Sequence, residues 1–191
     1  ADPLACGWHA VRLVINAIGT TDAKALVLGG GAIGLGAALS LTAQGVTDVT
    51  IIEPNDGRRA FLNDTCGQRA LPAPDQTNAY DIVIDGVGYA ATRETASAAV
   101  VPGGVIMHIG LGEATGGLDI RRFTLQEITF IGTYTYTPQD FRDTAAAIFD
   151  GSLGPLDWTE TRPLSDGAQA FADIRAGLVA APKIVLVPEG A

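Results

Sequence analysis

The feature that most constrains the fold is an apolar segment, residues 25–28, that leads directly into a glycine-rich loop. The loop has the pattern Gly29-x-Gly31-x-x-Gly34, and an apolar, helix-forming segment follows it. A short apolar run bounded by glycine predicts a buried strand of a parallel sheet. A strand, a tight turn and a helix in this order predict one βα unit of an open α/β sheet.

The spacing of the glycines is typical of a phosphate-binding turn. Gly29 permits the tight turn, Gly31 leaves room for a pyrophosphate beside the backbone, and Gly34 lets the helix lie close to the strand. The N-terminus of the helix, at Ala32 and Ile33, presents free N–H groups and the positive end of the helix dipole to an anion. The loop therefore predicts the pyrophosphate site of a dinucleotide.

An acidic residue ends the next predicted strand, residues 49–52. This residue, Glu53, lies 19 positions after Gly34, near the roughly 20 expected in a dinucleotide site. A carboxylate there accepts the ribose hydroxyls and repels a 2′-phosphate, which favours NAD over NADP; the alternative is a solvated carboxylate at a strand end. Arg58 and Arg59 follow, and either could bind a 2′-phosphate, although exposure on a surface helix is the favoured interpretation.

Two other interpretations of the glycine loop stay open. The first is a glycine turn in an α/β sheet that binds nothing. The second is the glycine loop of a methyltransferase, which usually has an acidic residue just before its first glycine and a glycine spacing of two. Val27 and Leu28 precede Gly29 here, and Gly34 falls three residues after Gly31. These residues favour the dinucleotide.

Composition limits the partners of the chain. Its 191 residues are 47% hydrophobic and 17% charged, which predicts a globular chain with a sizeable core. A net charge of −9 without a basic cluster argues against nucleic acid and anionic membrane surfaces as partners. No apolar run approaches the roughly 20 residues that span a bilayer. With no visible secretory signal and two distant cysteines, Cys6 and Cys66, we expect a cytoplasmic protein with reduced thiols.

The rest of the chain alternates predicted helices and strands. Helices are expected at residues 3–17, 33–43, 56–65, 90–100, 138–150 and from 165 or 166 to about 176. Strands are expected at residues 69–71, 80–88, 105–109, 128–134, 157–162 and 183–187, with 118–125 as a connecting arm. This alternation predicts a doubly wound parallel sheet of the Rossmann type, with a leading helix and a C-terminal helical arm. We expect a dinucleotide-binding domain at 1–150 and a distinct C-terminal segment at 151–191.

A series of short motifs in a fixed order spans nearly the whole chain. The motifs are Asp2-Pro3-Leu4-Ala5, Gly7-Trp8-His9-Ala10-Val11, the Gly29–Gly34 loop, Asp81-Ile82-Val83-Ile84-Asp85-Gly86-Val87-Gly88, Pro102-Gly103-Gly104-Val105, Ile109-Gly110-Leu111, Ile131-Gly132-Thr133-Tyr134, Arg162-Pro163-Leu164 before residues 168–171, and Lys183-Ile184-Val185-Leu186-Val187-Pro188. Each motif alone is unspecific. Their order and spacing resemble the second half of a medium-chain dehydrogenase/reductase, in the zinc-dependent alcohol and polyol dehydrogenase branch.

The resemblance implies hydride transfer between NAD and an alcohol or polyol. It places the nicotinamide ribose and carboxamide against Val87, Gly88, Ile109 and Leu111, and less firmly against Ile131; the alternative for these positions is packing and glycine turns. In that family a separate N-terminal domain carries the zinc ligands and most of the substrate pocket. We therefore expect weak cofactor binding and no turnover from this chain alone, zinc only in the full-length protein, and packing of residues 151–191 toward the missing catalytic domain.

Two further functions stay open. One is a zinc-independent, NADP-dependent quinone or enone reductase of the same superfamily, against which Glu53 argues. The other is a non-catalytic nucleotide-binding or redox-sensing module. No catalytic residue is assigned within the chain, since no serine, histidine and aspartate fall in a convincing order.

Asp2, His9 and His108 are the candidates for a metal-related role. Relatives often have glutamate at the position of Asp2, close to zinc, but N-capping of the first helix ahead of Pro3 is favoured here. Neither histidine has a second ligand at a metal-like spacing, so no metal site is expected. We expect His9 to be a packed or partly exposed polar residue and His108 to make a local hydrogen bond. Neither cysteine has the features of an activated thiol.

Residues 128–136 predict a self-association site. They are β-branched and aromatic, and no charge follows Glu127 in this stretch. At the edge of a sheet, their open N–H and C=O groups would pair with another chain. Related dehydrogenases dimerise through a sheet edge of this domain, so we expect a homodimer through this strand. Nonspecific association through the surface left by the missing domain is the alternative.

Overall fold

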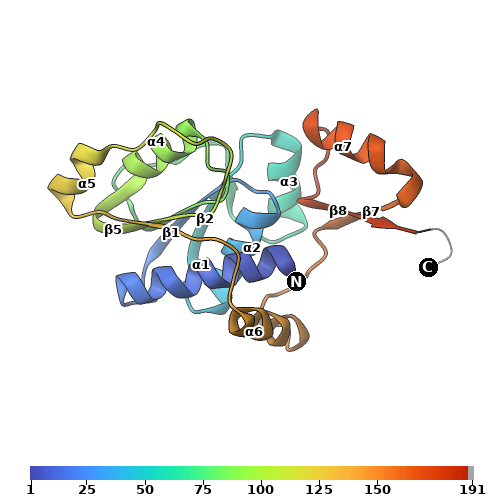
Figure 1. Ribbon diagram of the computed structural model, residues 1–191, viewed down its shortest axis with the longest axis horizontal. Coiled ribbons are helices and arrows are strands. Elements are labelled where there is room, and N and C mark those ends of the chain that lie inside the picture. Colours follow the sequence, from blue (N-terminus) through green and yellow to red (C-terminus); the bar gives the residue numbers. More distant parts are fainter. Residues whose placement is uncertain (189–191) are drawn as a thin grey trace.

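The centre of the structure is a parallel sheet of six strands. The computed structural model describes residues 1–188 and places the strands in the order β3-β2-β1-β4-β5-β6 (Figure 1). The strands are β1 (Lys24–Leu28), β2 (Asp48–Ile52), β3 (Ala70–Leu71), β4 (Tyr80–Asp85), β5 (Val100–His108) and β6 (Thr129–Gly132). The direction of strand addition reverses between β1 and β4, which creates the switch point of a Rossmann-type sheet. The predicted fold class is confirmed.

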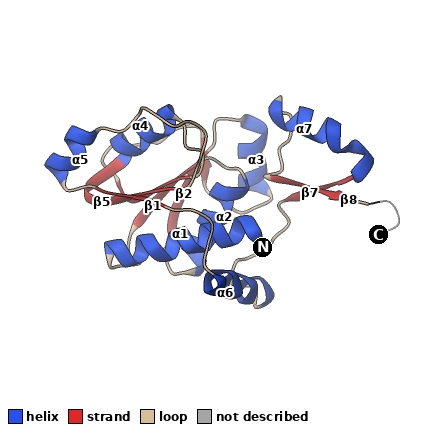
Figure 2. Cartoon of the chain, in the orientation of Figure 1, coloured by secondary structure: helices blue, strands red, loops and turns tan. Residues whose placement is uncertain are grey.

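Helices cover both faces of the sheet (Figure 2). The helices of one face are α1 (Asp2–Ile18), α2 (Ala32–Ala43), α3 (Asp56–Asp64) and α6 (Pro138–Phe149), and those of the other face are α4 (Ala90–Ala99) and α5 (Ile120–Gln126). Strand β1 shows why the central strands are apolar. Its Val27 belongs to the apolar core between the sheet and α1, α2, α3 and α6, which we call the first core. Its Leu26 belongs to the second core, between the sheet and α4 and α5, and both side chains are fully buried. A strand covered on both faces is therefore mostly apolar on both sides.

The leading helix α1 lies against α2 with almost no space between their backbones. A Cβ at Gly7 would lie 2.6 Å from Ala37 N and 2.6 Å from the carbonyl carbon of Gly36. Only glycine at position 7 permits this approach. The helix that precedes the sheet is therefore an integral part of one face.

Two connections differ from the sequence prediction. Strand β5 begins at Val100, not at residue 105, because Val100 pairs with Tyr80 before the register shifts between Tyr80 and Ile82. Residues 102–104, which lie between the predicted helix and the predicted strand, are therefore part of the strand. The connecting arm expected at residues 118–125 contains helix α5, whose N-cap Asp119 accepts a hydrogen bond from the N–H of Arg122.

Strand β6 lies at the edge of the sheet, as expected, but it is shorter than the predicted strand. It ends at Gly132, and Thr135 has a left-handed backbone with φ of 55°. This conformation is rare for a β-branched residue and is incompatible with a continuing strand. The strand predicted over residues 128–136 is thus reduced to four residues.

The C-terminal segment forms a small structure beside the main sheet. It contains β7 (Thr159–Pro163), the 3-10 turn η1 (Leu164–Asp166), α7 (Gly167–Arg175) and β8 (Lys183–Val187). The two strands pair only with each other, in parallel, and extend away from the main sheet near α3 (Figure 1). Helix α7 begins at Gly167, just after the predicted start at 165 or 166, and its N-cap Asp166 makes no side-chain capping hydrogen bond. Across residues 1–188, no helix is both long and apolar enough to cross a membrane.

A buried carboxylate joins α1 to α6. Asp140 is 1% exposed, and its carboxylate accepts a 2.7 Å hydrogen bond from Arg12 Nε and a 2.5 Å hydrogen bond from the Thr137 hydroxyl. His9 Nδ1 lies 2.8 Å from the same carboxylate, so His9 is a packed polar residue, as predicted. Burial by itself raises the pKa of Asp140, but the hydrogen bonds from Arg12, Thr137 and His9 outweigh it. The pKa of Asp140 therefore lies well below its usual range.

Replacing this carboxylate should loosen the contact between α1 and α6. We expect Asp140→Asn to lower the free energy of unfolding by about 2 kcal/mol at neutral pH, because hydrogen bonds to a charged group are lost. Urea unfolding measures the difference. Asp143→Asn on the same helix is the control, with an expected change within about 0.5 kcal/mol. Equal stabilities of Asp140→Asn and wild type would contradict the role of this group.

The same group gives the chain a pH dependence. The unfolded state binds a proton at Asp140 near pH 3.9, whereas the folded state binds it only at lower pH. The contribution of Asp140 is therefore complete above about pH 4 and is lost as the pH falls below that value. The difference in the free energy of unfolding between wild type and Asp140→Asn should begin to narrow as the pH falls from about 5 to about 3, and a difference that stays constant would argue against this origin.

Candidate functional site

A cavity of about 650 Å³ lies where β1, β2 and β4 end. Its walls come from the glycine-rich turn after β1, the end of β2, the loop at residues 72–74 and the first turns of α4. Ligands of open α/β sheets bind at this edge, beside the switch point. The cavity therefore has the position expected of a nucleotide site.

The glycines of the turn differ in what surrounds them. Gly29 has φ of 92°, and a Cβ at Gly34 would lie 1.8 Å from the carbonyl oxygen of Gly29. A Cβ at Gly30 would lie 2.4 Å from a methyl group of Leu62. Gly31, by contrast, has nothing within 4 Å of a built Cβ, and it lines the cavity. Gly29, Gly30 and Gly34 thus permit close packing, whereas Gly31 leaves open space at the cavity.

The open space at Gly31 lies at the start of α2. Gly31 is the N-cap residue and has no side chain to accept the first N–H groups of the helix. These groups, at Ala32, Ile33 and Gly34, have no acceptor within the helix. They provide hydrogen-bond donors and a positive dipole end for an anion at the cavity.

Alanine substitutions at a packed glycine and at the open glycine should change the free energy of unfolding by very different amounts. Gly34→Ala forces a methyl group into a main-chain carbonyl, so we expect a large loss of stability, about 3 kcal/mol or more. Gly31→Ala places its methyl group in open space and should change the stability by less than about 1 kcal/mol. Thermal unfolding of the two variants checks this. A Gly34→Ala variant as stable as Gly31→Ala would show that the turn does not pack as described.

Glu53 is fixed beside the cavity by main-chain hydrogen bonds. Its side chain is only slightly exposed, and Oε2 accepts a 3.0 Å hydrogen bond from the N–H of Gly30. Oε1 accepts a 2.8 Å hydrogen bond from the N–H of Asn55. A carboxylate has about four lone-pair positions, so two acceptor positions remain. Glu53 is therefore buried and oriented, and the alternative of a solvated strand-end carboxylate is wrong.

The two arginines that follow have different surroundings. Arg58 lines the cavity, donates a 3.0 Å hydrogen bond to the carbonyl of Val179, and places Nη1 3.9 Å from Glu53 Oε2. Arg59 donates to the carbonyl of Glu53 and pairs with Asp56. Arg58 is thus held between the C-terminal segment and Glu53, and it is not the surface residue that the sequence favoured.

The ends of β4 and β5 meet through close backbone contacts. Gly88 has φ of 80°, and a Cβ there would lie 2.2 Å from the carbonyl oxygen of Gly110. The structure brings Val87, Gly88, Ile109 and Leu111 together at this meeting point, and Leu111 is 83% exposed. Ile131 lies on the neighbouring strand, beside Met107. These positions form one continuous stretch along the carboxyl ends of strands β4, β5 and β6.

Asp85 is a site residue that the sequence reasoning missed. It is fully buried, and its Oδ1 accepts hydrogen bonds from the N–H groups of Val87 at 3.0 Å and Gly88 at 2.8 Å. Its Oδ2 accepts a 2.9 Å hydrogen bond from the Thr92 hydroxyl. The available signal was an acidic residue closing an apolar strand before small residues. Asp85 fixes the turn that carries two of the expected cofactor positions.

His108 lies near this aspartate without a hydrogen bond to it. Its Nε2 is 3.7 Å from Asp85 Oδ2, beyond hydrogen-bond distance. Its ring lies against Phe130, with centroids 5.5 Å apart. The local hydrogen bond predicted for His108 is therefore not formed with the polar side chain beside it.

The cavity is lined by further residues that the sequence did not single out. They are Pro72 and Pro74 in the loop after β3, and Tyr89, Ala91 and Thr95 at the start of α4. Tyr89 is 49% exposed, and its ring fills the space beside Gly112. The two prolines and Tyr89 line an apolar slot of the cavity, which suits a flat ring system. Spacing along the sequence gives no hint of it, because the loop and the helix are far apart in the chain.

The residues present do not fit a metal site. In the described part of the chain, no three His, Cys, Asp or Glu side chains come together as a ligand set. Asp2 lies inside α1, after the N-cap Ala1, and its carboxylate accepts a 2.7 Å hydrogen bond from the hydroxyl of Tyr136. The predicted N-capping by Asp2 is therefore wrong. Burial raises the pKa of the Cys66 thiol to about 11, which agrees with an unactivated cysteine.

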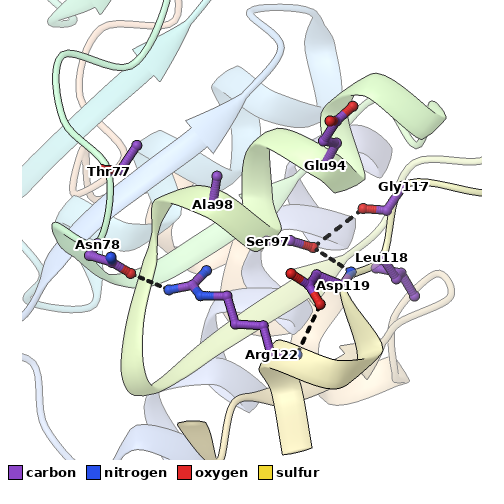
Figure 3. A pocket seen from close by; sticks show the side chains of 9 residues that line it. All are labelled: Thr77, Asn78, Glu94, Ser97, Ala98, Gly117, Leu118, Asp119 and Arg122. Carbon is purple, nitrogen blue, oxygen red and sulfur yellow. Dashed lines mark hydrogen bonds between the residues drawn. The ribbon is translucent and has the colours of Figure 1, made fainter. Parts of the chain in front are cut away.

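A larger cavity, of about 780 Å³, lies elsewhere, between the loop before β4, the end of α4 and the start of α5 (Figure 3). Several of its polar groups bond to each other. Arg122 donates to Asn78 and to the carbonyl of Val100, and Ser97 accepts a hydrogen bond from the N–H of Asp119. Neither the glycine-rich turn nor Glu53 lines this cavity. It is therefore separate from the candidate nucleotide site.

Comparison with known proteins identifies the family. The fold and the glycine-rich turn define a dinucleotide-type α/β domain. The zinc-binding dehydrogenase family matches residues 32–150, more than half of the chain, and the chain belongs to this family. The resemblance inferred from the motifs is confirmed.

Individual relatives match the chain over part of their own length. D-altritol 5-dehydrogenase from Agrobacterium fabrum is 30% identical over 142 residues, which cover 71% of this chain and 42% of the relative. Acetophenone reductase from Geotrichum candidum, solved with NAD, superposes with a TM-score of 0.81 at 21% identity, over 94% of this chain and 52% of that one. A zinc-binding dehydrogenase from Sinorhizobium meliloti, solved with NADP, gives a TM-score of 0.75 at 20% identity, over 90% and 54%. The chain thus spans about half the length of these proteins.

Proposed function

We propose that this chain is the NAD(H)-binding part of an oxidoreductase that transfers a hydride between the cofactor and an alcohol or polyol. One observation carries the proposal: the open glycine position at the start of α2 and the oriented carboxylate of Glu53 line the same cavity at the switch point of the sheet. Membership of the zinc-binding dehydrogenase family and a relative named for its action on a polyol support it.

In this proposal each half of the cofactor has its own set of residues. The pyrophosphate lies over Gly31 and accepts hydrogen bonds from the first N–H groups of α2, at Ala32 and Ile33. Glu53 accepts the hydroxyls of the adenosine ribose, and the slot beside Tyr89 takes the adenine ring. The nicotinamide half lies along the carboxyl ends of β4, β5 and β6. The residues beside it are Val87, Gly88, Ile109, Leu111 and Ile131. The bound nicotinamide supplies or accepts the hydride, and the chain orients it.

Glu53 also supports a preference for NAD over NADP. A 2′-phosphate would lie next to a buried carboxylate, and like charges at short distance are unfavourable. Arg58 could offset this charge, but it already donates to the carbonyl of Val179 and lies 3.9 Å from Glu53.

Calorimetric titration with NADH and NADPH tests both the site and its preference. We expect NADH to bind at least about tenfold more tightly, a difference of about 1.4 kcal/mol. Gly31→Val should abolish binding with an unchanged circular dichroism spectrum, because the side chain fills the space of the pyrophosphate. Glu53→Gln should reduce the preference for NADH. Equal or tighter binding of NADPH would show that Arg58 dominates and would favour an NADP-dependent reductase, and unchanged affinity in Gly31→Val would refute the site.

The C-terminal segment supports a contact with a further domain. A sheet of two strands is only marginally stable by itself. The segment also exposes large apolar side chains, among them Phe171 at 64% and Leu178 at 76%. We propose that residues 151–191, whose last three lie outside the described structure, pack toward the catalytic domain of the full-length protein. That domain would hold zinc and most of the substrate pocket. The cytoplasm is the proposed compartment, since both cysteines are free thiols.

A homodimer through strand β6 is also part of the proposal. The strand is at the edge of the sheet, so one side of its backbone is open to a second chain. A two-fold partner would extend the sheet across the interface and cover both edges. The short strand limits the number of main-chain hydrogen bonds, so side chains near Ile131 must contribute.

Sedimentation velocity tests the dimer. At tens of micromolar we expect a defined dimer, and Ile131→Lys should shift it to monomer by placing a charge at the two-fold contact. Val185→Lys on β8, another partly exposed apolar position on a strand, should leave the dimer intact. A monomeric wild type, or a dimer that only Val185→Lys disrupts, would locate association elsewhere.

A further inference from the structure

A buried arginine outside the sites described above holds the loop that follows β5. Arg93 lies on α4 and is 5% exposed. Its guanidinium makes four hydrogen bonds, all to main-chain carbonyls. The acceptors are Gly116 at 2.6 Å, Gly88 at 2.9 Å, Glu113 at 3.0 Å and Thr115 at 2.5 Å. One side chain therefore joins the turn after β4 to the loop at residues 110–117.

The charge of Arg93 has no carboxylate partner. Within residues 1–188, no Asp or Glu oxygen pairs with this guanidinium, and the side chain of Glu113 instead accepts a 2.8 Å hydrogen bond from the N–H of Ala90. A buried cation is costly unless its hydrogen bonds are satisfied. Five N–H donors in a rigid fork can satisfy several carbonyls of a loop that has no regular structure.

The loop depends on this side chain for its shape. Gly116 and Gly117 both have φ of 85°, a conformation that regular secondary structure does not supply. The other main-chain bonds of the loop, from Gly112 to Val87 and from Glu113 to Gly88, fix only its first half. Arg93 supplies the hydrogen bonds that fix Thr115 and Gly116 to α4.

We infer that Arg93 is a positioning residue for the nicotinamide half of the site, an inference that rests on the proposed function. The loop carries Leu111, which projects from the sheet edge with 83% of its surface exposed. By bonding Gly88 on one side and the loop on the other, Arg93 sets the distance between the two walls against which the nicotinamide would lie. Gly31 and Glu53, around which the adenosine half would lie, are not among the acceptors of Arg93.

This separation allows a test with two ligands. ADP-ribose contains the adenosine, the pyrophosphate and a ribose but no nicotinamide, whereas NADH contains all of them. Calorimetry on wild type, Arg93→Gln and Arg93→Lys gives both affinities for each protein. In Arg93→Gln we expect NADH to bind about tenfold more weakly and ADP-ribose to keep its affinity within about twofold. Arg93→Lys keeps the charge and should lie between the two.

A second readout follows the nicotinamide itself. The emission of bound NADH should move toward that of free NADH in Arg93→Gln, because the ring is no longer held. Arg122→Gln is the matched control: Arg122 also donates to a main-chain carbonyl, that of Val100, but at the other end of β5. It should change neither the emission nor the ratio of the two affinities.

Each outcome bears on one claim. Equal weakening of NADH and ADP-ribose in Arg93→Gln would reduce Arg93 to a general structural role and overturn the inference. A wild type that binds ADP-ribose as tightly as NADH would also overturn it, while leaving the dinucleotide site intact. A wild type that binds neither ligand would overturn the proposed function. If thermal unfolding shows that Arg93→Gln does not fold, Arg93→Lys decides, and unchanged NADH affinity in that variant would refute the inference.

Discussion

The structure depends on a direct backbone-to-backbone contact between the start of α2 and the turn that precedes it. Gly34 lies so close to the carbonyl of Gly29 that a Cβ would come within 1.8 Å of it, and a Cβ at Gly86 would lie 3.2 Å from Gly34. Strand β1, helix α2 and the turn after β4 therefore meet backbone to backbone. This contact brings the N-terminus of α2 to the sheet edge, which gives the cavity its anion-binding end.

The elements around this contact could be predicted closely from the sequence. Residues 25–28 and 49–52 were expected as strands, and the structure has Lys24–Leu28 and Asp48–Ile52. Central strands of a parallel sheet are covered on both faces, so their composition alone identifies them. The dinucleotide turn is equally local: its glycines and Glu53 belong to one βαβ unit, and their spacing follows from the length of one helix.

The outer elements and the second half of the site could not be predicted in this way. Helix α5 has seven residues and no buried one, so it lacks the periodic apolar pattern that identifies a helix. Strand β6 ends at Gly132 and the backbone at Thr135 is left-handed, which no composition rule anticipates. Asp85 and Arg93 act through main-chain groups of other segments, and such contacts exist only once the chain has folded.

Long-range contacts also connect the two parts into which the sequence prediction divides the chain at residue 150. The residues beside Glu53 bond directly to the C-terminal segment: Asn55 donates to the carbonyl of Gly177 at 2.9 Å and Arg58 to that of Val179 at 3.0 Å. Trp158 is buried against the first core. The corner of the cavity beside Glu53 is thus partly built by the segment that we propose to contact the catalytic domain, so the two parts of the chain do not fold independently at this point.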